Sequence, residues 1–156
     1  MQFFRAGLLG LCLAVAGCGG ESGGRPLTED AAARAALGDV GEVYRLYTVE
    51  KNKPPTRTAD FSPMARMSPM GMGAIESGDV IVRFGAALPD TGEEPGKGPG
   101  DEVLAYHKDV PTSGGPVLML NRTIRTMTPE EFQAAKLAGN ASSSAASNAK
   151  AKAKNR

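Results

Sequence analysis

The apolar residues of this chain change their spacing once, from a helical period to a strand period, and this change limits the fold. Residues 28–52 hold one apolar stripe at positions i, i+3, i+4 and i+7, the pattern of an amphipathic helix. The stripe consists of Val40, Val43, Tyr44 and Tyr47. From residue 79 onward, apolar residues alternate with polar ones, as they do in half-buried strands. The sequence therefore predicts an α+β domain.

Local signals mark both ends of the predicted helix. Thr28 is a suitable N-cap, and the acidic residues Glu29 and Asp30 follow it in the first turn, where the helix dipole favours them. Pro54-Pro55 ends the helix because proline cannot continue the backbone hydrogen bonds. Residues 54–78 have no sustained period, so we expect a connecting loop there.

Four segments in the second half have the composition of strands. They are residues 79–86, 102–108, 116–120 and 123–127. A Pro/Gly-rich loop, residues 88–100, separates the first two. Asn121-Arg122 lies between the last two and predicts a two-residue hairpin turn. We therefore expect the helix to pack on a four-stranded antiparallel sheet.

The C-terminal part begins with a strong helix signal. In Thr128-Pro129-Glu130-Glu131 the threonine caps, the proline takes the first helical position, and Glu131 completes a capping box. The sequence predicts a short helix from there to about Ala138, with Gly139 as its end. Residues 139–156 are low in complexity and predict a disordered basic tail, so the domain should span residues 28–138.

The N-terminal residues have the pattern of a targeting signal. Arg5 is followed by the apolar run Ala6–Gly17, which as a helix would be only about 18 Å long, against a hydrocarbon core of roughly 30 Å. A permanent membrane span is therefore not expected, and residues 1–17 are interpreted as a cleavable signal peptide. Residues 18–27, rich in glycine, would form a flexible tether.

The end of the run, Val15-Ala16-Gly17-Cys18, resembles the lipobox of bacterial lipoproteins. This resemblance implies that Cys18 receives lipid and becomes the first residue of the mature chain. Two alternatives stay open. Ala14-Val15-Ala16 is also a site for ordinary secretory cleavage, which would release a soluble protein. Cys18 could instead be only a small apolar residue of the run.

A wider resemblance covers about two-thirds of the mature chain. Gly41–Phe61, Ala74–Gly85 and Val103–Phe132 resemble a group of small, uncharacterised bacterial lipoproteins, whose C-terminal half looks like the sheet of type II pseudopilins. The shared motifs are structural and imply no catalytic residues. Pilin-like hairpins usually carry Asp-Gly at the tight turn, where this chain has Asn121-Arg122.

Charge and cysteine content exclude some functions. Lys and Arg number 18 against 17 for Asp and Glu, so no concentrated positive surface is expected and no nucleic-acid partner. The two cysteines, Cys12 and Cys18, both precede the domain, which can therefore form no disulfide.

Two groups of residues could carry other chemistry. His107 and Asp109 share a strand face, as a base and its orienter would, although a solvent-facing histidine is the simpler interpretation. Acidic residues flank the Gly-rich loop, but they lack the spacing of a Ca²⁺ loop and should only solvate it. These acids are Glu93, Glu94, Asp101 and Glu102. We therefore expect no enzyme activity and no cofactor.

Four methionines lie close together in the chain. They are Met64, Met67, Met70 and Met72. Thioethers are soft ligands suited to Cu(I), and this spacing resembles extracytoplasmic copper carriers. The alternative interpretation is that these residues pack a loop onto the core, because methionine fills irregular gaps.

Taken together, these features predict a non-enzymatic protein of the cell envelope, held by lipid on a membrane and facing the periplasm. It would serve as a structural or interaction module with an envelope protein partner. Gly19 after the cysteine favours the outer membrane by resemblance to lipoprotein sorting. The basic residues of the tail would contact anionic head groups or cell-wall polymers, or only increase solubility. They are Lys150, Lys152, Lys154 and Arg156. A periplasmic Cu(I)-binding protein is the alternative function.

Overall fold

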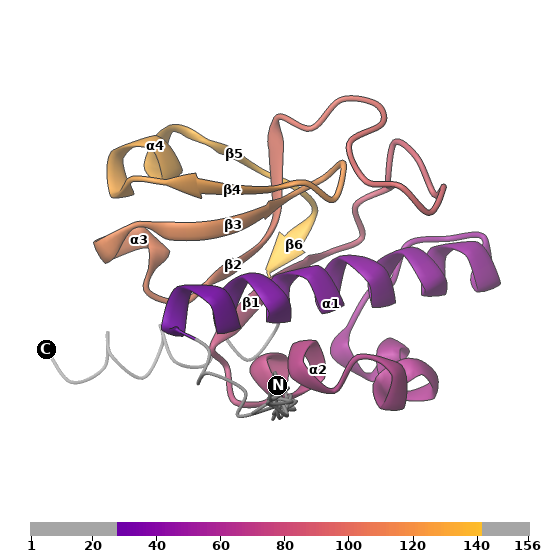
Figure 1. Cartoon of the computed structure of the whole chain (residues 1–156). Helices are drawn as coiled ribbons and strands as arrows, with labels where there is room; N and C mark the ends of the chain where they lie inside the picture. The colour runs from indigo at the N-terminus through magenta and orange to yellow at the C-terminus, as the bar shows by residue number, and fades with distance from the viewer. Residues whose placement is uncertain (1–27, 142–156) are drawn as a thin grey trace, which may run out of the picture.

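The computed structural model describes residues 28–141, in which helices pack against both faces of a mixed sheet (Figure 1). The elements are α1 (Glu29–Lys51), η1 (Thr58–Met67), α2 (Pro69–Glu76), β1 (Val80–Phe84), β2 (Glu102–His107), α3 (Val110–Ser113), β3 (Gly115–Met119), β4 (Ile124–Met127), α4 (Pro129–Ala134), β5 (Lys136–Leu137) and β6 (Asn140–Ala141). The predicted α+β class is confirmed. The predicted signal peptide, the tether and most of the predicted tail lie outside the described residues.

Helix α1 follows the prediction closely. The Thr28 hydroxyl accepts a hydrogen bond from the backbone N–H of Ala31, and the helix ends at Asn52, which adopts a left-handed conformation. The predicted stripe is buried against the sheet, where it meets alternate residues of the strands. Figure 1 shows α1 running along this face of the sheet, with α2 on the other side of the helix.

The sheet has six strands where four were expected. Its order is β4-β3-β2-β1-β6, with antiparallel pairing throughout this path, and β5 pairs with β2 in parallel. The two extra strands come from residues 136–141, which the sequence assigned to the end of a helix and to the tail. Because β6 pairs with β1, the folded domain extends to Ala141 rather than ending at residue 138.

Helix α4 ends at Ala134, four residues before the predicted end. Ala135 is already extended, and the chain then pairs with the first two residues of β2. Ala138 is thereby fully buried and donates its backbone N–H to the Val103 carbonyl at 3.0 Å. Residues 135–138 carry no apolar helical stripe, and burial with sheet pairing stabilises them more than another helical turn would. The predicted capping box of Thr128 and Glu131 is confirmed.

The segment predicted as a loop, residues 54–78, is helical. Its two helices are stabilised by tertiary contacts that leave no periodic pattern in the sequence. The Asp39 carboxylate on α1 accepts hydrogen bonds from the backbone N–H groups of Met70 and Gly71 at 3.1 Å, and so caps α2. A Cβ at Gly71 would lie 2.7 Å from the Asp39 Cβ, so only glycine permits this close approach.

The sheet buries side chains on both faces. A bulge in β2 between Val103 and Ala105 places Leu104 and Ala105 together in the main core under α1. A smaller core lies on the opposite face, beneath α3 and α4. Its buried residues are Val103, Val110, Val117, Met119 and Phe132.

Candidate functional site

A cleft of about 560 Å³ opens where the N-terminal half of α1, helix α2 and the ends of β1 and β2 meet. Its apolar lining consists largely of small residues. They include Ala32, Ala33 and Ala36 of α1, Gly73 and Ala74 of α2, and Val80 of β1. These short side chains leave an open, largely apolar floor that can accommodate an extended chain segment.

The rim of this cleft is charged. Lys108 forms an ion pair with Asp79, with 2.5 Å between Nζ and Oδ1. Ser77 donates its hydroxyl to the other carboxylate oxygen of Asp79 at 2.7 Å. The hydrogen bond from Lys108 and then that from Ser77 hold the pKa of the Asp79 carboxyl below its usual value. Asp79 is thus an ionised group that ties the start of β1 to the end of β2.

His107 and Asp109 also line the cleft and lie close together, but not on one strand face as predicted, because β2 ends at His107 and Asp109 is the N-cap of α3. The distance between His107 Nδ1 and Asp109 Oδ2 is 3.5 Å, and the histidine side chain is 22% exposed. A nucleophile would have to donate its proton to this imidazole. Ser77 is the hydroxyl residue of the cleft lining, and it donates its proton to Asp79 at 2.7 Å, with the Ala74 carbonyl as the more distant acceptor at 3.2 Å. No nucleophile–base pair is assembled among the described residues of the cleft.

The four methionines have different environments. Met64 and Met72 are buried in the main core, whereas the side chains of Met67 and Met70 are exposed, at 63% and 42%. Met70 also lines the cleft. The first two therefore pack the helices onto the sheet, as methionine often does, and only the second two are accessible from solvent.

The acidic residues around loop 88–100 do not gather. Glu94 lies 3.8 Å from Lys97, and Asp101 lies 3.9 Å from Lys136, so each faces a lysine. Within residues 28–141, no group of three or more histidine, cysteine or acidic side chains is arranged to hold a metal ion.

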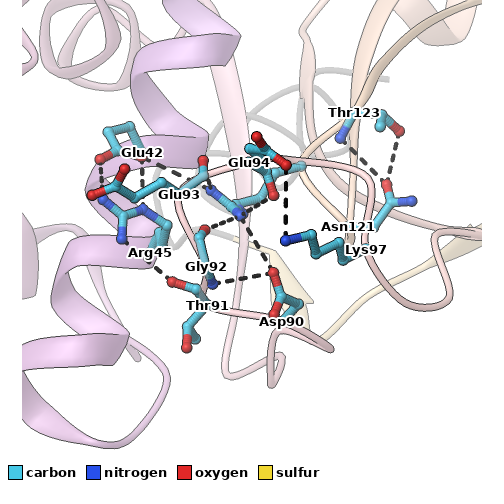
Figure 2. A network of polar contacts seen from close by, with 11 residues as sticks. Glu42, Arg45, Asp90, Thr91, Gly92, Glu93, Glu94, Lys97, Asn121 and Thr123 are labelled. Carbon is cyan, nitrogen blue, oxygen red and sulfur yellow. Dashed lines mark hydrogen bonds and ion pairs between the residues drawn. The ribbon is translucent and has the colours of Figure 1, made fainter.

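A second feature, which was not predicted, is a network of polar contacts that includes Glu42, Asp90 and Gly92 (Figure 2) and that Arg122 joins. The Arg122 side chain is only 5% exposed and donates to three carbonyl oxygens of loop 88–100, those of Gly92, Glu93 and Glu94. Its guanidinium also lies 3.9 Å from Glu42 of α1 and 3.8 Å from Asp90. The arginine therefore fastens the loop to both the helix and the β3–β4 hairpin.

The backbone of Arg122 explains why the hairpin differs from the prediction. Arg122 has φ 66°, and its N–H donates to the Met119 carbonyl, while the Met119 N–H donates to Thr123. Asn121 is not in the left-handed region, so the turn is a three-residue connection rather than the predicted two-residue one. The contacts of the buried guanidinium offset the cost of a positive φ in a residue other than glycine.

Cys18 and the basic side chains of the tail lie outside the described residues. Among the helices within residues 28–141, none combines the length and apolarity that crossing a bilayer requires. No family model matches this chain, and neither a curated protein nor a solved structure matches it.

Proposed function

We propose that this chain is a lipid-anchored protein of the cell envelope, acylated at Cys18, and that it acts as a non-enzymatic interaction module. One observation carries the proposal: a twelve-residue apolar run ends in Ala16-Gly17 and is followed directly by Cys18, and a glycine-rich segment then separates the cysteine from the helix that Thr28 caps. Gly19 favours the outer membrane, with the domain facing the periplasm.

The position of the cleft supports a contact role near the membrane. Glu29, the first residue of α1, lines the cleft. Ten peptide units separate Cys18 from Thr28, and a fully extended chain of that length spans at most about 36 Å. An acylated Cys18 would therefore keep the cleft within roughly that distance of the lipid surface. Partners embedded in the same membrane, or lying on it, are the ones such a cleft would meet.

The geometry of the cleft supports a non-enzymatic role. Its floor is made of small apolar side chains, which contribute packing rather than chemistry. Its serine hydroxyl is engaged by Asp79 and its lysine pairs with the same carboxylate. A groove of this kind binds a chain segment through contact area and charge.

Metabolic labelling with a palmitate analogue tests the anchor. The wild-type chain and the Cys12→Ser variant should both incorporate the label and partition into detergent, whereas Cys18→Ser should do neither. Cys12 is the matched control because it is the other cysteine and lies within the apolar run. An unlabelled mature chain that begins at Gly17 would show secretory cleavage instead and contradict the proposal.

A further inference from the structure

The rim of the cleft has an excess of negative charge. The titratable residues that line it are Glu29, Asp79, Lys108, Asp109 and His107, so three carboxylates face one lysine and one histidine. Lys108 already pairs with Asp79 at 2.5 Å, and His107 lies 3.5 Å from Oδ2 of Asp109. This leaves the Glu29 carboxylate and the other oxygen of Asp109 to act on an incoming group. A cationic segment that also carries apolar side chains therefore complements both the rim and the floor.

The chain itself contains such a segment. Residues 149–154 read Ala-Lys-Ala-Lys-Ala-Lys, and residues 142–156 contain no acidic residue. In an extended backbone, successive side chains point to opposite sides. An extended Ala/Lys repeat would thus present three alanines on one side and three lysines on the other. The alanines suit the floor of Ala33 and Gly73, and the lysines suit the carboxylates of the rim.

The direction of the chain at Ala141 leads toward the cleft. Strand β6 is antiparallel to β1, with Asn140 opposite Phe84 and Ala141 opposite Arg83. The chain therefore leaves Ala141 toward Val80, which lines the cleft and lies three residues, about 10 Å, further along β1. The fifteen residues after Ala141 can span up to about 50 Å, so residues 149–154 can reach the cleft.

We propose that the basic segment 149–154 docks in the cleft of its own chain and competes there with external partners. The covalent connection gives the segment an effective concentration on the order of millimolar, so a weak site suffices. The inference deepens the contact role proposed for the cleft and rests on it, but it does not depend on acylation of Cys18. A partner would have to displace the segment before it could bind.

Zero-length cross-linking of the purified full chain with a carbodiimide tests this docking. The reagent joins a lysine amine to a carboxylate in contact with it, forming an amide with loss of one water. Peptide mass spectrometry should find Lys150, Lys152 or Lys154 linked to Glu29 or Asp109 within monomers. Glu29→Gln combined with Asp109→Asn should lower the total yield of tail cross-links about threefold to tenfold, and 0.5 M salt should also lower it.

A control variant and a second cleft variant show whether the cross-links are specific to the cleft. Glu50→Gln removes an exposed carboxylate at the far end of α1 and should leave the yield unchanged. Ala33→Leu fills the floor without changing any charge and should lower the yield. Tail lysines linked equally to Glu50 and Glu29, links found only between two chains, or the absence of links to the cleft would overturn the proposal. The palmitate experiment tests Cys18 and not the cleft, so the proposed lipid anchor and the proposed docking of the tail can each fail without the other.

Discussion

The hydroxyl of Tyr44 forms two hydrogen bonds with the backbone of Ala86. It donates to the Ala86 carbonyl at 2.8 Å and accepts from the Ala86 N–H at 3.0 Å. The Tyr44 side chain is fully buried, and burial raises the pKa of its phenol well above the usual value. Two aromatic rings continue this contact. The ring centroid of Phe61 lies 6.1 Å from that of Tyr44 and 5.6 Å from that of Phe84. This tyrosine therefore joins the middle of α1 to the residues that follow β1.

Tyr44→Phe should lower the free energy of unfolding by about 1–3 kcal/mol, because it leaves a buried N–H and a buried carbonyl of Ala86 without their partner. Chemical denaturation of the purified protein measures this difference. Tyr47→Phe is the matched control, since Tyr47 is also buried on α1 but its hydroxyl makes no hydrogen bond within residues 28–141. Equal losses in the two variants would contradict a specific role of the Tyr44 hydroxyl.

Arg122→Ala should lower the free energy of unfolding by roughly 2–4 kcal/mol, because the carbonyls of loop 88–100 and the nearby carboxylates lose a buried charged donor. Arg122→Gly should be about 1 kcal/mol more stable than Arg122→Ala, since glycine adopts the positive φ without strain. Hydrogen exchange of residues 88–100 should accelerate in both variants. If the two variants are equally stable, backbone strain at residue 122 does not contribute; if both resemble the wild type, the arginine does not hold the loop.

Met64→Ala should lower the free energy of unfolding by about 2–5 kcal/mol, because it leaves a cavity in the main core. Met67→Ala, the exposed control from the same segment, should change it by less than about 0.5 kcal/mol. Thermal unfolding of the two variants, compared with the wild type, checks both values. Similar losses for both would mean that Met67 is buried in solution.

Copper titration tests the alternative function. It compares Cu(I) binding by the wild type with binding by the Met67→Leu/Met70→Leu variant, because of the four methionines only these two have exposed side chains.

The sequence predicted those elements whose signals are local. The stripe on α1, the capping box at Thr128 and the alternation of Val80, Val82 and Phe84 each depend on residues within one element, and each is confirmed. Helix α2 was missed because its cap comes from Asp39, 31 residues away along the chain. No pattern within residues 54–78 could have indicated that contact.

The candidate site was predicted only in part, for the same reason. His107 and Asp109 are two residues apart, so their proximity was predictable, but they meet across the turn from β2 into α3 and not on one strand face. The cleft they line also needs Glu29 and Met70, which only the packing of α1 against α2 brings near them. The role of Arg122 was missed because a single arginine in a turn gives no sign that a distant loop will bury it. Its unfavourable position in a tight turn was the one available signal.

Glu42→Gln should reduce stability in a pH-dependent way. Two hydrogen bonds from Arg45, Nε to Oε2 at 2.9 Å and Nη2 to Oε1 at 2.5 Å, lower the pKa of Glu42 from its usual 4.5. A carboxyl whose pKa is lower in the folded than in the unfolded chain stabilises the fold at any pH above its unfolded-state pKa. This stabilisation is lost as the pH falls through its folded-state pKa. The variant should therefore be less stable than the wild type at pH 7, and the difference should narrow below pH 4.5.

The size of this effect is limited, because the Glu42 side chain is 44% exposed and solvent screens the pair, so we expect less than about 1 kcal/mol at pH 7. Urea denaturation from pH 7 to pH 3 in the wild type, Glu42→Gln, Arg45→Ala and the double variant isolates the pair. Since Arg45 is the main cause of the lowered pKa, Glu42→Gln should lose most of its pH-dependent effect in the Arg45→Ala background. An unchanged pH dependence there would assign it to Arg122, whose Nη1 lies 3.9 Å from the same carboxylate.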